Sequence, residues 1–134
     1  MSQENVKLVR DLYDLWNRGD LDGATAMFDP EVVWHGYTHL PESGRRDGVD
    51  AVRSWVTDFA EAWGEISVSI ERLVEVGDDS VLALVRMSGR GRDSGVAVTS
   101  GLDGHLWTIR AGRIVAVRMY QGSRAALEAV GLSE

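Results

Sequence analysis

The segment DGHLWTIRAGRIVAVRMYQ, residues 103–121, predicts two antiparallel strands joined by a two-residue loop. Bulky and β-branched side chains on both sides favour strands, and Ala111-Gly112 suits a tight hairpin turn. With this loop, Arg110 lies opposite Arg113, and the pairing of every residue further along the hairpin follows. The hairpin therefore decides which side chains share each face of the sheet.

The predicted register creates one mixed and one apolar face, because side chains alternate along a strand. On the mixed face, the pairs are His105 with Arg118, Asp103 with Tyr120, and Trp107 with Ala116. The apolar face carries Leu102, Leu106, Val115, Val117 and Met119. A turn at residues 92–95 adds to the mixed face Leu82, Leu84, Arg86 and Ser88. It adds to the apolar face Val81, Ala83, Val85 and Met87.

Two interpretations of these faces remain open. The mixed face is too polar for a dry core and too aromatic for open water, which favours a partly enclosed cavity. The alternative is that the mixed face is exposed to solvent while the apolar face packs on helices. A slip of one residue in the register would exchange the two faces.

Three helical segments precede this run of strands. Apolar residues recur at helical spacing in residues 9–16 and 49–63, and a short helix follows Asp20 and stops at Pro30. The spacing predicts strands at residues 31–37, 66–70, 81–90, 96–110 and 114–121, and a last helical turn at 124–130. Helices grouped before a run of hairpins indicate an α+β fold, with helices on one face of an antiparallel sheet.

The composition disfavours several classes of function. The 134 residues are a usual size for one domain, and we expect a single domain over residues 1–134. The formal net charge of −7 disfavours nucleic acid as a partner, and no apolar run is long enough to span a bilayer. The absence of cysteine excludes disulfides and thiolate chemistry. These features predict a cytoplasmic protein that binds neither nucleic acid nor membranes.

Several motifs spread along the chain resemble a known family. They are YDLWNRGDL (13–21), PEVVW (30–34), GVDAVR (48–53), GRGR (89–92), SGV (94–96), LWTIRAGRIV (106–115) and LEAVGL (127–132). The chain resembles the nuclear transport factor 2-like superfamily and, within it, the SnoaL-like group that includes polyketide cyclases. The resemblance implies one SnoaL-like domain, a cone-shaped curved sheet wrapped around three N-terminal helices (a cystatin-like roll). It also implies a pocket at the open end and dimers through the convex sheet face.

Two residues of the mixed face are candidates for proton transfer. Asp103 and His105 lie two apart on one strand, where burial raises the pKa of a carboxyl and histidine titrates near neutrality. The alternative is an ordinary surface pair beside a glycine-containing turn. Opposite them, Arg118 and Tyr120 would steady negative charge that develops on a substrate oxygen.

One departure from the family pattern bears on catalysis. Relatives often carry Asp-Arg just after the last strand, where this chain has Gly122 and Ser123. The missing acid weakens the cyclase hypothesis and favours a binding protein. Alternatively, such an aspartate only caps the last helix, and Ser123 takes over the cap.

Further side chains are candidates for lining the pocket, since aromatic walls with sparse polar groups are usual in ligand sites. The arginines could instead pair with internal acids. The predicted substrate-binding residues are Arg118, Tyr120, Trp107, His35, Trp16, Trp34, Trp55, Phe59 and Arg86. His35 and His39 have no carboxylate at a suitable spacing, so we expect no metal site.

Three hypotheses for function follow. The first is a cofactor-free acid/base enzyme acting beside a carbonyl, by isomerisation, cyclisation or dehydration. The second is a non-catalytic module that binds a small apolar or aromatic molecule in the same pocket. The third is an interaction domain whose cavity is filled by tryptophan side chains. We also expect a homodimer through the convex face, with contacts from Val85, Met87, Val98, Leu106, Val115, Val117 and Met119.

Overall fold

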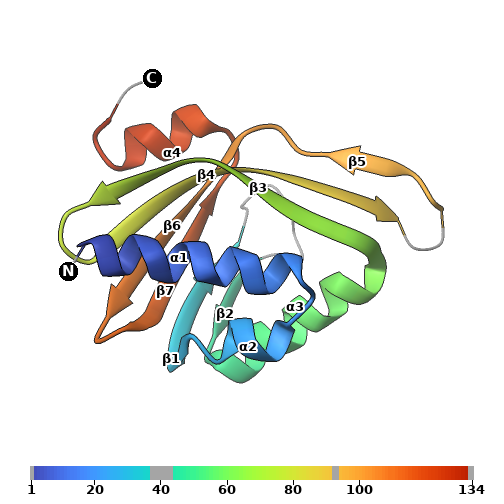
Figure 1. Ribbon diagram of the computed structural model, residues 1–134, viewed down its shortest axis with the longest axis horizontal. Helices are drawn as coiled ribbons and strands as arrows, with labels where there is room; N and C mark the ends of the chain where they lie inside the picture. The colour runs from blue at the N-terminus through green and yellow to red at the C-terminus, as the bar shows by residue number, and fades with distance from the viewer. Residues whose placement is uncertain (1, 37–43, 92–93, 133–134) are drawn as a thin grey trace.

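The computed structural model describes residues 2–36, 44–91 and 94–132. Within these ranges, four helices accompany one curved sheet (Figure 1). The helices are α1 (Ser2–Asn17), α2 (Leu21–Thr25), α3 (Val49–Ala62) and α4 (Ser123–Ala129). The strands are β1 (Phe28–His35), β2 (Arg45–Asp47), β3 (Trp63–Val76), β4 (Ser80–Gly91), β5 (Ala97–Thr99), β6 (Asp103–Arg110) and β7 (Arg113–Tyr120).

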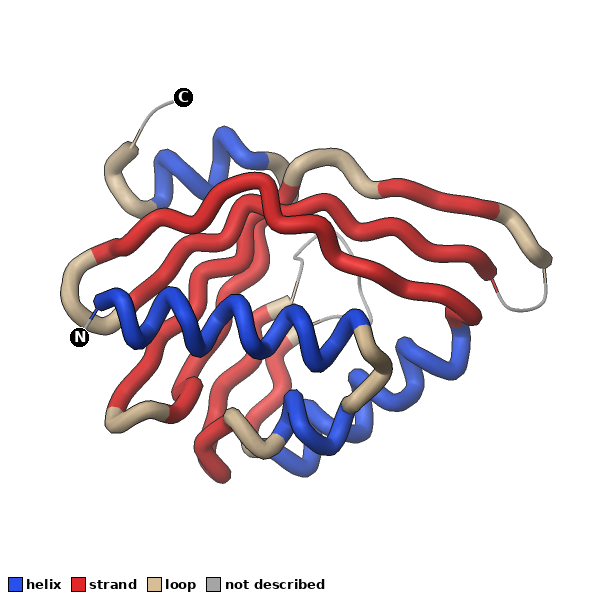
Figure 2. Tube along the Cα trace, in the orientation of Figure 1, coloured by secondary structure: helices blue, strands red, loops and turns tan. Residues whose placement is uncertain are grey.

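The strands form one sheet in the order β2-β1-β7-β6-β4-β3, and β5 pairs with the end of β4. Neighbouring strands are antiparallel, except that β1 and β7 run parallel. Figure 2 shows the long strands curving over the N-terminal helix, with the C-terminal helix on the other side. The predicted α+β fold with a cone-shaped sheet is confirmed.

The two faces of the sheet have separate cores. Helices α1, α2 and α3 cover the inner face, where buried residues include Val9 of α1, Val52 of α3 and Val81 of β4. Helix α4 covers part of the outer face, where Ala126 and Leu127 pack against outward side chains of β4. Alternation along β4 therefore supplies both cores from one strand.

Two polar side chains fix the N-terminal helices in place. Asp20 caps α2 as predicted, because its Oδ1 accepts a hydrogen bond from the Gly23 N–H at 2.8 Å. Asn17, the last residue of α1, accepts from the Val68 N–H at 2.7 Å and donates to the Val68 carbonyl at 2.9 Å. Since β3 is an edge strand, this pair satisfies its backbone and holds α1 over the inner face.

Several predicted boundaries differ from the structure. β1 begins at Phe28 rather than residue 31, and residues 45–47 form β2 in a stretch where no strand was predicted. The long strand predicted at residues 96–110 is divided into β5 and β6. The division occurs at Ser100, which forms two hydrogen bonds with Met87 of β4. The Ser100 N–H donates to the Met87 carbonyl at 2.8 Å, and the Met87 N–H donates to Ser100 Oγ at 2.9 Å.

The predicted cap of α4 by Ser123 is wrong. Ser123 is the first residue of the helix, Gly122 occupies the N-cap position with φ of 88°, and no side chain caps the helix. The Gly122 N–H donates instead to Oδ1 of Asp103 at 2.8 Å. A carboxylate at the start of β6 thus holds the chain at its entry into α4.

The hairpin loop is confirmed. Ala111 and Gly112 have positive φ angles of 50° and 74°, the conformation that a tight two-residue hairpin turn requires. Arg110 pairs with Arg113, as predicted. The turn therefore begins the pairing where the sequence places it.

The predicted register beyond the first pairs is wrong, because β7 contains a β-bulge. Ile109 pairs with Ile114, but Thr108 pairs with Ala116, which leaves Val115 as an extra residue. A bulge of one residue shifts all later pairs and moves the following side chains of β7 to the opposite face. Turn chemistry gives no signal for a bulge inside the strand.

The bulge changes the membership of both faces. His105 pairs with Met119 and Trp107 with Val117 on the inner face, whereas Arg118 pairs with Leu106 on the outer face. Tyr120 lies on the outer face as well, opposite Gly104. The predicted faces of β4 are wrong for a different reason: Ser88 pairs with Thr99 of β5, but Leu82 pairs with Leu106 of β6, one residue beyond the position that the turn predicts. Val81, Ala83 and Val85 therefore face the inner core, with Met87 packed against them, and Leu82 and Leu84 lie on the outer face.

The predicted set of dimer contacts changes as a result of these two register shifts. Val85 and Val117 are buried in the inner core, and Met87 and Met119 line a cavity there, so these four side chains cannot supply an outer contact surface. The homodimer itself stays a prediction.

Candidate functional site

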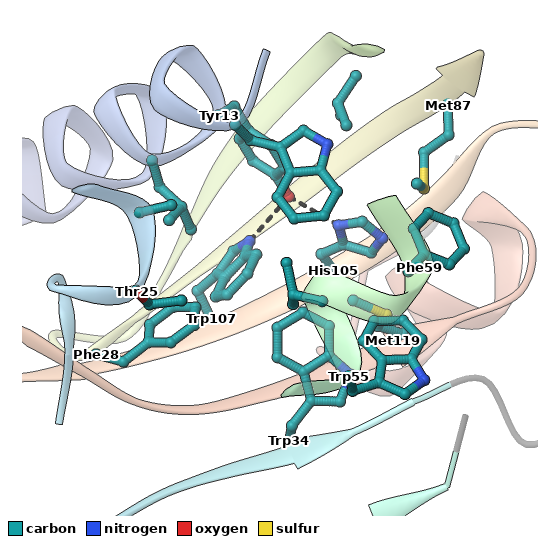
Figure 3. A pocket seen from close by; sticks show the side chains of 15 residues that line it. Tyr13, Thr25, Phe28, Trp34, Trp55, Phe59, Met87, His105, Trp107 and Met119 are labelled. Carbon is teal, nitrogen blue, oxygen red and sulfur yellow. Dashed lines mark hydrogen bonds between the residues drawn. The ribbon is translucent and has the colours of Figure 1, made fainter. Parts of the chain in front are cut away.

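A cavity of about 160 Å³ lies between the inner face of the sheet and helices α1–α3 (Figure 3). Seven of the fifteen described lining side chains are aromatic. They are Tyr13, Trp16, Phe28, Trp34, Trp55, Phe59 and Trp107. The other lining residues are Leu12, Ala24, Thr25, Val56, Val68, Met87, His105 and Met119. Six of the predicted site residues lie together here: Trp16, Trp34, Trp55, Phe59, His105 and Trp107.

The rings of this wall pack on one another. Trp55 of α3 lies 5.5 Å from Trp34 of β1 and 5.4 Å from Phe59, measured between ring centroids. Phe28 stacks on Trp107 at 6.3 Å. These separations lie within the range of favourable aromatic pairs, so the rings support each other across strands and helices.

A chain of hydrogen bonds runs through three buried side chains beside the cavity. Trp107 Nε1, which can only donate, lies 2.9 Å from the Tyr13 hydroxyl. The same hydroxyl lies 2.8 Å from Nδ1 of His105. The hydroxyl accepts from the indole, and the tautomer of His105 decides whether the hydroxyl donates to Nδ1 or accepts from it.

His105 is uncharged at neutral pH. The side chain is 3% exposed, and burial lowers its pKa to about 4. The imidazole is therefore neutral at pH 7, which leaves one of its ring nitrogens able to accept a hydrogen bond. No carboxylate, lysine or arginine is among the residues described as lining the cavity.

Two polar members of the wall, Tyr13 and Thr25, are not among the predicted site residues. Tyr13 lies on the apolar face of α1, where a buried hydroxyl needs a partner, and that requirement was the available signal. Thr25 is also buried, and its Oγ1 donates to the Leu21 carbonyl at 2.9 Å and accepts from Arg53 Nη2 at 3.0 Å. No periodicity marks Thr25, because α2 is a single short turn.

Asp103 does not share the cavity with His105. It is half-buried, bonds the Gly122 N–H, and lines a neighbouring hollow of about 300 Å³. Phe59 and Met87 line both the cavity and this hollow, so the two spaces adjoin. The predicted pair of Asp103 and His105 is thus divided between them.

Four predicted binding residues lie away from the cavity. Arg86 is exposed and forms an ion pair with Glu71, with Nε 3.4 Å from Oε1. Tyr120 packs in the outer cluster beneath α4. Arg118 is exposed on β7, in register with His35 of β1. Partial burial and the nearby Arg118 charge lower the pKa of His35.

The described residues give no sign of a metal site or a membrane span. No group of three or more histidine, cysteine, aspartate or glutamate side chains there could hold a metal ion, and His39 lies outside the described residues. No helix in the described ranges is both long and apolar enough to cross a membrane. The expectations of no metal and no membrane partner stay predictions.

The family follows from a match along most of the chain. The model of the SnoaL-like domain family matches residues 9–117. The chain belongs to the SnoaL-like domain family. The matched residues run from α1 to β7 and include all the cavity-lining residues except Met119. The family predicted from the sequence motifs is confirmed.

Solved structures similar to this SnoaL-like domain share its fold. An NTF2-like protein of unknown function from Burkholderia pseudomallei is 20% identical, with 96% of this chain and 98% of that chain covered and a TM-score of 0.79. Bal32a, from a soil-derived mobile gene cassette, is 18% identical, with 96% and 97% covered and a TM-score of 0.81. TerC, co-crystallised with polyporic acid, is 17% identical, with 95% and 97% covered and a TM-score of 0.75. No curated protein sequence matches the chain.

Proposed function

We propose that this SnoaL-like domain binds a small aromatic molecule without net charge in the cavity between α1–α3 and the sheet. The observation that carries the proposal is the lining, in which aromatic rings come from both walls and no charged side chain is described. Aromatic walls pack favourably on planar apolar ligands. An anion would lose its hydration there without gaining a counter-charge.

The volume of the cavity sets the size of the ligand. A dry apolar cavity of about 150 Å³, engineered in another protein, binds benzene. The cavity here has about 160 Å³, so one ring with a small substituent fits. A longer ligand would pass Phe59 and Met87 into the neighbouring hollow of about 300 Å³. TerC, a protein of the same fold, was co-crystallised with polyporic acid, which supports small-molecule binding on this fold.

The test is a titration with toluene, followed by calorimetry and by thermal unfolding. We expect saturable binding of one toluene per chain and a raised Tm. Val56 lines the cavity, so Val56→Phe fills it and abolishes binding. Thr57 is the next residue of α3 and does not line the cavity, so Thr57→Phe is the matched control and keeps binding. Equal binding by both variants would overturn the proposal.

Acid/base catalysis is the second candidate function, favoured by the Tyr13–His105 hydrogen bond at the cavity wall. His105 can exchange a proton through Tyr13, and Asp103 lies in the adjoining hollow, within reach of a ligand that spans both spaces. However, burial lowers the pKa of His105 to about 4, which makes it a weak base at pH 7. Binding without turnover therefore ranks first.

A single probe separates the two candidates. Acetophenone carries exchangeable protons on its methyl group, and a base that removes one in D₂O leaves deuterium there. Under the binding proposal, proton NMR shows exchange at the buffer rate. Exchange above that rate, lost in His105→Gln and in Asp103→Asn, would instead establish the catalytic pair. If the exchange is lost in His105→Gln but kept in Asp103→Asn, His105 alone is the base, and the role of Asp103 is to hold Gly122 by a hydrogen bond.

A further inference from the structure

We infer that the indole N–H of Trp34 recognises a hydrogen-bond acceptor on the bound molecule. The ligand class is then an aromatic ring that bears a neutral oxygen acceptor, such as an aryl ketone, aldehyde or ether. This inference rests on the proposed binding function and adds the polar group that the ligand must carry.

The inference starts from one unsatisfied donor. Trp34 is 5% exposed, and its Nε1 is the one buried side-chain nitrogen or oxygen atom in the described ranges without a hydrogen-bond partner. Buried donors in native proteins nearly always have an acceptor, because leaving one without a partner costs free energy. A donor of this kind in a cavity wall indicates that the acceptor is supplied by the ligand.

A second tryptophan in the same wall provides the contrast. Trp107 and Trp34 lie 6.2 Å apart between ring centroids and both line the cavity. The Trp107 indole donates to Tyr13, so its hydrogen-bonding requirement is met within the protein. The two rings therefore share an environment and differ in whether the protein supplies an acceptor.

The other buried polar side chains of the lining already have partners. Tyr13 and His105 bond each other at 2.8 Å, and Thr25 bonds both Leu21 and Arg53. Trp34 is thus the buried lining residue on which an acceptor gains a new hydrogen bond without breaking an existing one. A hydrocarbon of the same shape would bind by packing alone.

An acceptor reaches Nε1 of Trp34 when a neighbouring ring moves, because this atom is buried. Figure 3 shows the Trp34 ring extending from β1 into the cavity beside Trp55. Trp55 packs on it at 5.5 Å and is only partly buried, so its ring can turn when a ligand enters. Phe28, the neighbour at 6.3 Å, is buried and holds the other side of Trp34 in place.

The experiment compares two probes of matching shape in three proteins. Acetophenone carries a carbonyl oxygen where α-methylstyrene carries a methylene carbon. Their dissociation constants are measured by calorimetry in the wild type, in Trp34→Phe and in Trp55→Phe. Trp34→Phe keeps an aromatic ring and removes the donor. Trp55→Phe removes a similar volume from the same cavity and leaves the Trp34 donor unchanged.

We expect the preference for acetophenone over α-methylstyrene to fall roughly tenfold in Trp34→Phe, the value of one hydrogen bond to a buried donor. In Trp55→Phe both affinities change with the packing, but the preference falls much less than in Trp34→Phe, because the Trp34 donor is kept. An unchanged preference in Trp34→Phe, with both probes bound, would overturn the inference alone. Binding of neither probe to the wild type would overturn the proposed function and the inference together.

A spectroscopic measurement covers the case in which Trp34→Phe does not fold. In the ¹⁵N-labelled wild type, the Trp34 indole N–H resonance should move downfield with acetophenone and not with α-methylstyrene. The Trp107 indole N–H, which already donates to Tyr13, serves as the internal control. Equal responses of the Trp34 resonance to the two probes would contradict the inference.

Discussion

The two faces of the sheet use alternate residues of the same strands but are packed in different ways. On the outer face, α4 lies so close to β6 that a Cβ atom at Gly104 would collide with Ala126. On the inner face, the same strand places His105 and Trp107 beside a cavity of about 160 Å³. Tight packing stabilises a fold and a cavity destabilises it. The cavity on the inner face therefore lowers the stability of the fold but provides space for a ligand.

The largest effect should come from the outer face. Gly104→Ala should lower the free energy of unfolding by about 2 to 3 kcal/mol, since the new Cβ meets Ala126 and Leu82 and forces α4 away from the sheet. Gly101→Ala is the control, because a Cβ there meets nothing within 4 Å. Urea unfolding measures both variants. Equal stabilities would mean that α4 is not packed tightly on β6.

The buried imidazole of the inner face should make stability depend on pH. His105 titrates at about 4 in the folded state and near 6.5 in the unfolded state, so between these values the unfolded chain binds the extra proton. Stability is therefore lost as pH falls from 6.5 towards 4, on the order of 2 kcal/mol at pH 5 from this residue.

The measurement is urea unfolding at pH 7 and pH 5 in the wild type and in His105→Gln. The variant should lose much less stability between the two pH values than the wild type. The same loss in both proteins would show that His105 is not the group that titrates.

Trp34 and Trp107 of the cavity wall should differ in what they contribute to folding. Trp107→Phe leaves Tyr13 without the donor that it accepts from, whereas Trp34→Phe removes a donor that has no partner. We expect Trp107→Phe to be less stable than Trp34→Phe by about 1 kcal/mol, measured by unfolding without ligand. The opposite order would mean that Trp34 makes the more valuable bond.

The smallest effect should come from an outer residue that the hairpin register alone would place inside. Arg118 is exposed on the outer face, so Arg118→Ala should change the affinity for toluene by less than about twofold. Calorimetry with toluene measures this. A loss of affinity comparable to that of Val56→Phe would show that Arg118 belongs to the binding site after all.

The sequence predicts the fold class and most helices and strands, because the apolar spacing and turn residues are local signals. Two residues, Ala111 and Gly112, are enough to predict the turn. The bulge at Val115 could not be predicted, because nothing in Ile114-Val115-Ala116 distinguishes an extra residue from a paired one. That one residue moved Arg118 and Tyr120 from the predicted site to the outer face.

The aromatic wall of the site could be predicted, whereas its polar bonds could not. Trp16, Trp55 and Phe59 lie on apolar helix stripes that have to face the sheet. The Tyr13–His105 hydrogen bond joins residues 92 positions apart, and no pairing rule connects a helix face to one position of a distant strand. Such contacts depend on how the helices lie on the sheet.

The central claim is that the inner face holds a ligand in its cavity, and three methionines test it most directly. Met87 and Met119 line the cavity, whereas Met27 does not. In protein with ¹³C-labelled methionine methyl groups, a toluene titration should shift Met87 and Met119 with one shared saturation curve and leave Met27 unchanged. Ring currents of a bound aromatic molecule are the cause. No saturable shift of Met87 and Met119, or an equal shift of all three, would contradict the account.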